Sequence, residues 1–259
     1  MGYLRIILLL CFWSSSSAAY EIRVDYRHRP PEMSIKNKAY SGPIVEITRT
    51  LASRAGARLK ESQRQFKASM TLLQRGYLEL LPRTFCTAER LKIIDFLGPI
   101  GFQEKKVEFL VRKGNKGSIK TYQDLYKLRV GVKRGTAYFS DFDKDHKIVK
   151  VNASDDLALV KMFAKKRFDT MTIIDKKSAE EALKKIDFVD FEYAEFFEPK
   201  PIWNFFGIPK SLDKKEELQK VLTNMVVTGE VAKIYKKYNA PPPTYEAKAG
   251  LPSCLSLVK

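Results

Sequence analysis

The sequence predicts an α/β protein of two lobes, each with a mostly parallel sheet flanked by helices. Short apolar strands alternate with amphipathic helices along the chain, an order typical of parallel sheets covered by helices. The alternation runs to about residue 102 and restarts at about residue 106. The chain has 259 residues, of which 44% are hydrophobic, so it can bury two cores of this kind.

The first lobe is predicted to open with a strand at 21–26, EIRVDY, whose branched and aromatic residues favour extended backbone. Segment 41–57 then predicts a helix, because Pro43 stands in its first turn and Gly56 near its end. A strand at 57–63, a short helix at 69–76 and a strand at 77–81 follow. This order predicts parallel pairing of the strands.

The second lobe repeats the alternation. Strands are predicted at 106–113, 129–135, 146–152, 168–175 and 191–197, and helices at 121–128, 136–143, 154–166 and 178–186. The chain then returns to the first lobe with a strand at 204–210 and a long amphipathic helix at 214–238, broken near Gly229. The proline-rich tail after residue 240 is predicted to be irregular and mobile.

These patterns predict the domain organisation of the chain. The first lobe takes residues 20–102 plus 206–240, the second takes 106–198, the hinge crossings fall at 103–106 and 199–205, and the tail is 241–259. Two lobes joined in this way leave a cleft at their junction, where small ligands bind.

The N-terminus has the pattern of a secretory signal peptide. Arg5 precedes a short apolar run, and the small residues Ser17, Ala18 and Ala19 predict cleavage after residue 19. No later window of about 20 apolar residues predicts a membrane span. The sequence therefore predicts export of a mature chain that starts at Tyr20.

Cysteine and histidine are scarce in the mature chain. Cys86 and Cys254 remain after cleavage, and whether they pair in an oxidising compartment stays open. Cys86 is expected to be a small buried residue beside a functional turn. With only two histidines and no ligand spacing, no metal site and no cofactor are predicted.

Basic residues exceed acidic ones, with 47 lysines and arginines against 30 acids and a net charge of +17. The lysines recur at helical spacing, as on a solvated basic face, and no basic strand carries the interleaved aromatics of a nucleic-acid module. No nucleic-acid partner is predicted. The charge favours an anionic small ligand over a cationic one.

Six segments in order carry a resemblance over about 20–240. They are IRVDYRHRPPEMSI, SGPIVEITRTLASRAGA, LLQRGYLELLPRTFCTAERLKIIDFLGPI, YQDLYKLRVGVKRGTAY, MFAKKRFDTMTIID and TGEVAKIYKKY. Together they resemble the bacterial extracellular solute-binding proteins of family 3, the periplasmic amino-acid-binding type. The resemblance implies a type II periplasmic binding fold whose lobes close on a small solute by hinge rotation. It implies a periplasmic monomer that serves an ABC-type permease complex or a sensor, and no catalytic residue.

The resemblance also implies which residues bind the solute. In the family, the arginine of a Thr-x-x-Arg motif binds the ligand's α-carboxylate, and here that residue is Arg90. Backbone N–H groups of Gly135 and Thr136, at a helix start in the second lobe, would bind the same anion. Glu79, where the family usually has aspartate, is expected to be structural.

The sequence departs from the family pattern at several ligand-contacting positions. Arg83 and Phe85 stand where small residues are usual, and the first loop offers Arg27, Arg29 and Glu32 where an aromatic commonly packs on the ligand. The acid expected to bind an ammonium group is Asp175, but it is six residues from Asp169 rather than five, so that site has either a bulge or an altered role. We therefore include Arg83, Phe85, Glu32 and Asp175 among the candidate ligand-binding residues.

Arg83, Arg90 and Arg134 would make the pocket unusually cationic. They predict a ligand with more negative charge than an ordinary amino acid, such as a dicarboxylate or a phosphorylated compound. The alternative function is a cleft enzyme on the same scaffold, a dehydratase of small carboxylic acids. Its general acid would have to be Glu32 or Asp175.

Overall fold

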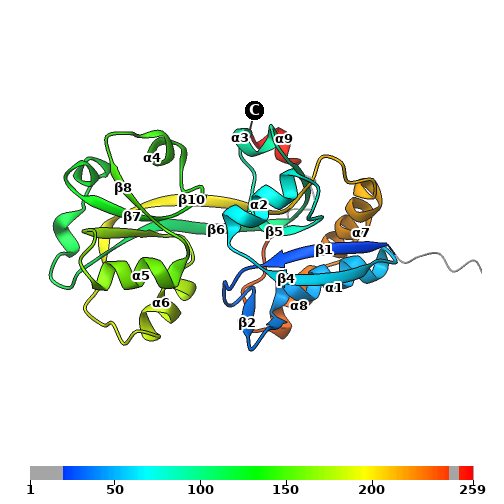
Figure 1. Ribbon diagram of the computed structural model, residues 1–259, viewed down its shortest axis with the longest axis horizontal. Coiled ribbons are helices and arrows are strands. Elements are labelled where there is room, and N and C mark those ends of the chain that lie inside the picture. The colour runs from blue at the N-terminus through cyan, green and yellow to red at the C-terminus, as the bar shows by residue number, and fades with distance from the viewer. Residues whose placement is uncertain (1–19, 245–250, 259) are drawn as a thin grey trace, which may run out of the picture.

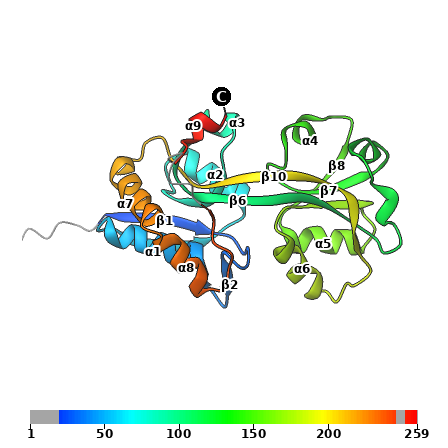
Figure 2. The same cartoon turned by 180° about the vertical axis from the view of Figure 1, so that it is seen from behind.

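The computed structural model describes residues 20–244 and 251–258. Two bodies of helices and strands lie side by side, and β6 (Asp95–Val111) and β10 (Glu192–Ile208) run through both of them (Figure 1, Figure 2). We call the body that holds the first strand lobe 1 and the other body lobe 2. The predicted signal peptide lies outside the described residues. Among the described helices, none combines the length and apolar character needed to cross a membrane.

Lobe 1 is built on the parallel pair β1 (Glu21–Tyr26) and β4 (Arg58–Gln63). Helix α1 (Pro43–Arg54) connects them and buries the face formed by Ile44, Ile47 and Leu51, as the helical spacing predicts. The predicted long helix is two helices, α7 (Lys215–Val227) and α8 (Glu230–Lys237). They are separated by Gly229, which has the left-handed φ of 73° that glycine adopts without strain. The predicted break is confirmed.

Lobe 2 is built on β7 (Arg129–Lys133), which pairs in parallel with β8 (Val149–Ala153) and β9 (Thr170–Ile173). Helices α5 (Asp156–Ala164) and α6 (Lys176–Lys184) pack against this sheet and against each other. The predicted parallel pairing is confirmed for β1 with β4 and for β7 with β8 and β9. It is wrong for β5 (Leu81–Phe85), which pairs antiparallel with β10, and the long strands β6 and β10 are antiparallel to each other and to their neighbours.

Gly131→Ala tests the packing of this sheet. The added Cβ would lie 2.4 Å from Cζ of Phe168, whose ring is 1% exposed, so the core would be overpacked. We expect the free energy of unfolding to fall by about 1–3 kcal/mol, measured by urea denaturation. Gly117→Ala, whose new methyl meets only the ends of flexible side chains, should change it by no more than about 0.5 kcal/mol. Equal stability of the two variants would contradict the packing described here.

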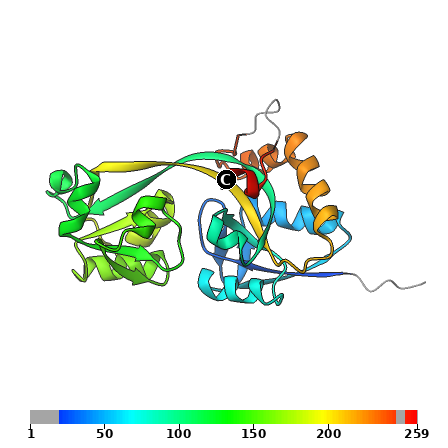
Figure 3. The same ribbon diagram turned by 90° about the horizontal axis from the view of Figure 1, so that it is seen from above.

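The connection between the lobes is one continuous antiparallel ladder of β6 and β10, seen from above in Figure 3. The prediction of two separate strands at 191–197 and 204–210 is wrong. The single strand β10 runs through both ranges, and within it Pro199 pairs with Lys106 and Pro201 with Glu104. Proline is tolerated where its missing N–H faces an open strand edge, and β5 covers β10 only over 204–207. The hinge positions 103–106 and 199–205 stay predictions.

Some predicted elements are shifted in the structure. The strand predicted at 77–81 is β5 (Leu81–Phe85), and the helix predicted at 69–76 is α2 (Phe66–Gln74). Glu79 precedes β5 and holds the side chain and backbone N–H of Arg23, in line with the structural role expected for it. The helix predicted at 121–128 is a 3₁₀ helix (Tyr122–Lys127), and the one predicted at 136–143 starts only at α4 (Ser140–Lys144). The other short elements are β2 (Ser34–Lys36), β3 (Ala39–Ser41), α3 (Ala88–Leu91), a 3₁₀ helix at Lys116–Ser118 and α9 (Cys254–Leu257).

The prediction of an irregular, mobile tail is wrong for the described part of residues 241–259. The backbone of Thr244 exchanges two hydrogen bonds with that of Phe102, at 2.8 and 2.9 Å. Helix α9 then contacts α3, and a disulfide fastens Cys254 to Cys86 in the turn that precedes α3. The tail is therefore part of lobe 1.

Candidate functional site

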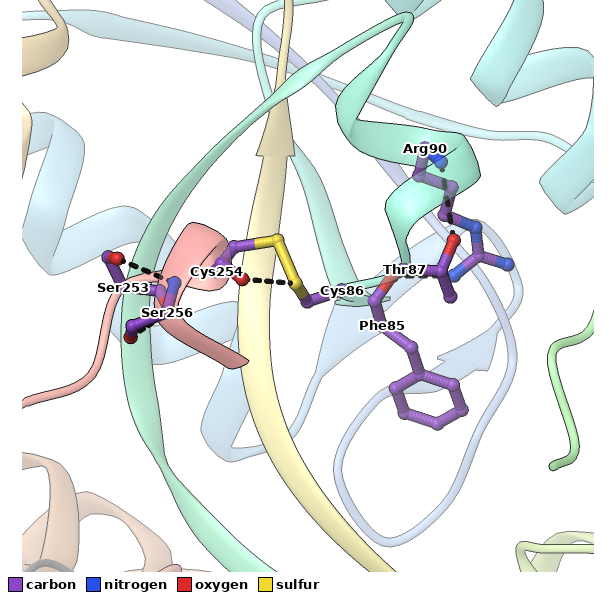
Figure 4. Close-up of a disulfide and its surroundings, with 7 residues drawn as sticks. All are labelled: Phe85, Cys86, Thr87, Arg90, Ser253, Cys254 and Ser256. Atoms are coloured by element: carbon purple, nitrogen blue, oxygen red, sulfur yellow. Dashed lines mark hydrogen bonds between the residues drawn. A yellow bond between two sulfur atoms is a disulfide. The ribbon is translucent and has the colours of Figure 1, made fainter. Parts of the chain in front are cut away.

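The turn between β5 and α3 presents Arg90 at the junction of the lobes. Thr87 is in extended conformation, and its hydroxyl accepts a hydrogen bond from the backbone N–H of Arg90 at 3.2 Å, which caps the short helix α3. Figure 4 shows the Arg90 side chain lying alongside Thr87 and Phe85. The threonine of the Thr-x-x-Arg motif therefore positions the arginine through a local capping bond.

Arg90 links the two lobes through backbone carbonyls. Its Nη1 donates to the carbonyl of Phe85 in lobe 1 at 2.8 Å, and its Nη2 donates to the carbonyl of Gly135 in lobe 2 at 2.9 Å. These bonds use two of the five N–H donors of the guanidinium. Burial lowers the pKa of Arg90 to about 10, so it stays charged at neutral pH.

A disulfide joins Cys86, between Phe85 and Thr87, to Cys254 at the start of α9 (Figure 4). The expectation that Cys86 is merely a small buried residue is wrong. The bond closes a sequence separation of 168 residues and fastens the end of the chain to the turn that carries Arg90. It therefore restrains the turn from the side opposite to the lobe junction.

An aromatic ring lies at the centre of the junction. Phe66, at the first position of α2, has the guanidinium of Arg90 4.9 Å from its ring centroid and that of Arg27 at 4.6 Å. From lobe 2, Gly135 packs so closely that an added Cβ would lie 3.3 Å from Phe66 Cδ1. Gly135 also has a φ of 76°, so both the contact and the backbone favour glycine there.

A cavity of about 590 Å³, which we call the outer cavity, lies between the lobes beside this ring. Thr136 lines it together with Phe66, whereas Arg90 lies next to these residues outside the lining. Seven basic side chains line it against three acids: Arg27, Arg29, Lys38, Arg64, Lys133, Arg134 and Lys185 against Asp155, Asp156 and Glu181. This lining favours an anionic occupant.

The side chains of four further candidate residues make no hydrogen bond to Arg90 among the described residues. Phe85 is buried in the lobe 2 core cluster, and its carbonyl rather than its ring contacts Arg90. Glu32, Arg83 and Asp175 meet in a buried group of charges that also contains Arg29 and Lys105. We call these residues, Arg29, Glu32, Arg83, Lys105 and Asp175, the Asp175 cluster.

The Asp175 cluster crosses the lobe junction. The carboxylate of Asp175, in lobe 2, lies 2.6 Å from Arg29 Nη1, 2.6 Å from Lys105 Nζ and 3.4 Å from Arg83 Nη2. Arg83 also forms an ion pair with Glu32, and its side chain is fully buried. Burial disfavours the charged carboxylate, but Arg83, Lys105 and Arg29 outweigh it and hold the pKa of Asp175 well below its usual range. The charged side chains Glu32, Arg83 and Asp175, which were predicted to bind ligand, form ion pairs within the cluster instead.

The six-residue spacing of the two aspartates has a simple structural cause. Asp169 precedes β9 and pairs with Arg129, while β9 ends at Ile173 and Asp175 stands at the start of α6. Asp175 has therefore left the strand, and strand periodicity does not govern its direction. Together with Glu32 and Lys105 it lines a second cavity of about 720 Å³ on the hinge side.

The sequence pointed to Arg27 in the first loop but did not place it among the predicted ligand-binding residues, and Phe66 was missed altogether. The signal for Arg27 was its place at the end of the first strand, where a parallel sheet presents its loops. Phe66 gave no signal, because it preceded the predicted helix. Within residues 20–244 and 251–258, no group of three or more His, Cys, Asp or Glu side chains is placed to hold a metal.

Two α/β lobes on long shared strands, with a cation-lined cavity between them, define a protein that binds a small solute in an interlobe cleft. The chain belongs to the bacterial extracellular solute-binding proteins, family 3, whose family model matches residues 20–241. A search of curated proteins finds no match.

Solved structures share this fold. A mutant of the arginine-binding protein from T. maritima has a TM-score of 0.70 at 20% identity, covering 85% of this chain and 95% of its own. An ancestral arginine-binding protein bound to arginine has a TM-score of 0.69 at 23% identity, and the match covers 84% of this chain and 97% of that protein. The arginine-, lysine-, histidine-binding protein of Geobacillus stearothermophilus has a TM-score of 0.70 at 17% identity, covering 87% and 97%. The chain therefore has the type II periplasmic binding fold.

Proposed function

We propose that this solute-binding protein acts in the periplasm, where it captures a small anionic or amino-acid-like ligand between its lobes and presents it to an ABC-type permease or a sensor. Residues 1–19 would direct its export and be removed. It would work as a monomer, because each chain carries both walls of the cleft. Hinge rotation near 103–106 and 199–205 would open and close the outer cavity.

Arg90 carries this proposal. Its side chain is partly buried at the lobe junction, and among the described residues no carboxylate lies within 4.0 Å of it. A buried charge without a counter-charge is costly, so the site gains from an anion that supplies one. From lobe 2, the Gly135 carbonyl accepts from Arg90, and the Thr136 N–H donates to the Lys133 carbonyl at 3.1 Å rather than standing free at a helix start. Of the two predicted N–H donors, it is therefore that of Gly135 that would contact the ligand upon closure.

Structures with this fold support an amino-acid-like ligand, since those cited above are arginine-binding proteins and a further one is bound to glutamine. The charge of the outer cavity instead favours a more anionic ligand. Both kinds of ligand share a carboxylate, which Arg90 would bind in a bidentate manner.

The enzyme alternative is not supported. The family consists of solute-binding proteins, and a dehydratase would need an acid that carries a proton near neutral pH. Asp175 is instead held ionised by three cations, and Glu32 is paired with Arg83. Neither acid has the environment of a proton donor.

Arg90→Ala tests the proposed function. We expect ligand affinity to fall by about 1.5–3 kcal/mol, or roughly 10- to 150-fold, because a charged hydrogen bond is lost. The measurement is calorimetric titration with the small molecule that mass spectrometry identifies in the purified protein. Arg58→Ala, which removes the same charge from an exposed position on β4, is the control and should bind normally. Unchanged affinity in Arg90→Ala would contradict the proposal.

A further inference from the structure

Arg27 is a second guanidinium that shares the Phe66 ring with Arg90. It follows β1 directly, and its Nη2 donates to the carbonyls of Pro82 and Arg83 at 2.8 and 3.0 Å. Both guanidiniums contact one aromatic side chain, at 4.6 and 4.9 Å from its ring centroid. Backbone carbonyls hold both of them in place and leave their charges uncompensated.

The charges that surround Arg27 are mostly positive. Arg27 forms no ion pair within 4.0 Å among the described residues, and its buried Nε has no hydrogen-bond partner there. Burial lowers the pKa of Arg27, and the neighbouring Arg29, Arg83 and Arg90 lower it further. Asp175 offsets this charge only in part, since Asp175 and Glu32 are already shared among the three cations of the Asp175 cluster.

Two guanidiniums that share one ring, and that have no carboxylate partner among the described residues, are matched by a ligand that brings two negative charges. A guanidinium binds a carboxylate or phosphate through two parallel N–H donors, and Arg27 and Arg90 each keep donors free for this. Arg27 and Phe66 line the outer cavity, and Arg90 lies outside its lining, 4.9 Å from the Phe66 ring centroid. A solute in that cavity meets Arg27 directly and would contact Arg90 by extending past the Phe66 ring.

We propose that Arg27 and Arg90, which both contact the Phe66 ring, together select a dianionic solute, either a dicarboxylate or a phosphate monoester. This inference rests on the proposed function and assigns the class of ligand. Arg90 binds one anionic group, and Arg27 provides the second charge that separates a dianion from a zwitterionic amino acid of similar size.

The test compares ligands that differ by one charge. The mature protein is titrated calorimetrically with succinate and with succinamate, which has the same length but one carboxylate fewer. Glycerol 3-phosphate serves as the phosphate arm, and L-glutamine as the zwitterion. We expect succinate or glycerol 3-phosphate to bind at least about 10-fold more tightly than succinamate and L-glutamine, since each charged hydrogen bond contributes on that scale.

Variants of Arg27 locate the preference. Arg27→Met should weaken binding of the preferred dianion by about 10- to 100-fold and change succinamate affinity by no more than about threefold. Arg27→Lys keeps the charge without the planar fork, and should retain part of the preference even if the methionine variant folds poorly. Arg58→Met, with the same charge change on an exposed part of β4, should keep the preference of the unmodified protein.

Three outcomes would overturn the inference. They are binding of L-glutamine or succinamate as tight as that of every dianion, no binding of any dianion, and an unchanged preference in Arg27→Met. None of these requires that the proposed function fail, because a zwitterion whose binding is lost in Arg90→Ala would still identify a solute-binding cleft. Loss of Arg90 dependence would instead count against the proposed function itself.

Discussion

Asp175→Asn is expected to lower the free energy of unfolding by about 3–5 kcal/mol. Asparagine keeps the shape of the side chain but removes the negative charge that Arg29, Lys105 and Arg83 share. Glu32 alone would then face three cations, and two of the guanidiniums are almost fully buried. Leaving buried charges without their partner costs far more than breaking an exposed pair.

Urea denaturation measures this loss, with Asp190→Asn as the control. Asp190 is exposed, so the same chemical change should alter the free energy of unfolding by no more than about 0.5 kcal/mol. The cluster also joins the lobes, so Asp175→Asn should be more extended in solution scattering. If the two aspartate variants were equally stable, the cluster would be contributing little to the fold.

The same cluster sets a dependence on pH. The pKa of Asp175 lies well below its usual range, while an aspartate in an unfolded chain titrates near about 3.9. A depressed folded pKa contributes stability that is fully present above the unfolded pKa and is lost as the pH falls through the folded one. The stability difference between the unmodified protein and Asp175→Asn should therefore be constant near neutral pH and shrink below about pH 4.

The parts of the fold that sequence could predict are those fixed by local chemistry. Pro43 and Gly42 open α1, and Gly229 separates α7 from α8, because these residues act on the backbone within one turn. The position of Arg90 at the lobe junction followed from the Thr-x-x-Arg turn. Its ligand remains a prediction, since fold and position do not fix specificity.

The parts that sequence could not predict depend on side chains that meet across long distances in the chain. Arg83 and Asp175 are 92 residues apart in the chain. Arg83 lies in a strand with a φ of 53°, and no local sequence pattern indicates that its guanidinium points to the carboxylate of Asp175. Phe66 and Gly135 likewise meet only because the lobes face each other. Charge composition predicted an anionic ligand. Only the structure distinguishes Arg83, which forms ion pairs with Glu32 and Asp175, from Arg27, which forms no ion pair among the described residues.

Removing the disulfide, by Cys86→Ser together with Cys254→Ser, is expected to lower the free energy of unfolding by about 2–5 kcal/mol. The bond closes a loop of 168 residues, and the entropy that such a cross-link removes from the unfolded chain grows with loop length. It also holds α9 against the turn that carries Thr87 and Arg90 (Figure 4). We therefore expect ligand affinity to fall as well, by less than it does in Arg90→Ala.

Reduction supplies the matched control for this double variant. Dithiothreitol should bring the unmodified mature protein to the stability and affinity of the double serine variant, and it should leave the variant itself unchanged. A stable variant with normal affinity would mean that α9 and the turn hold their places without the covalent bond. A stable variant with weakened affinity would mean that the bond acts mainly by positioning Arg90, because a loss confined to binding cannot come from the entropy of the unfolded chain.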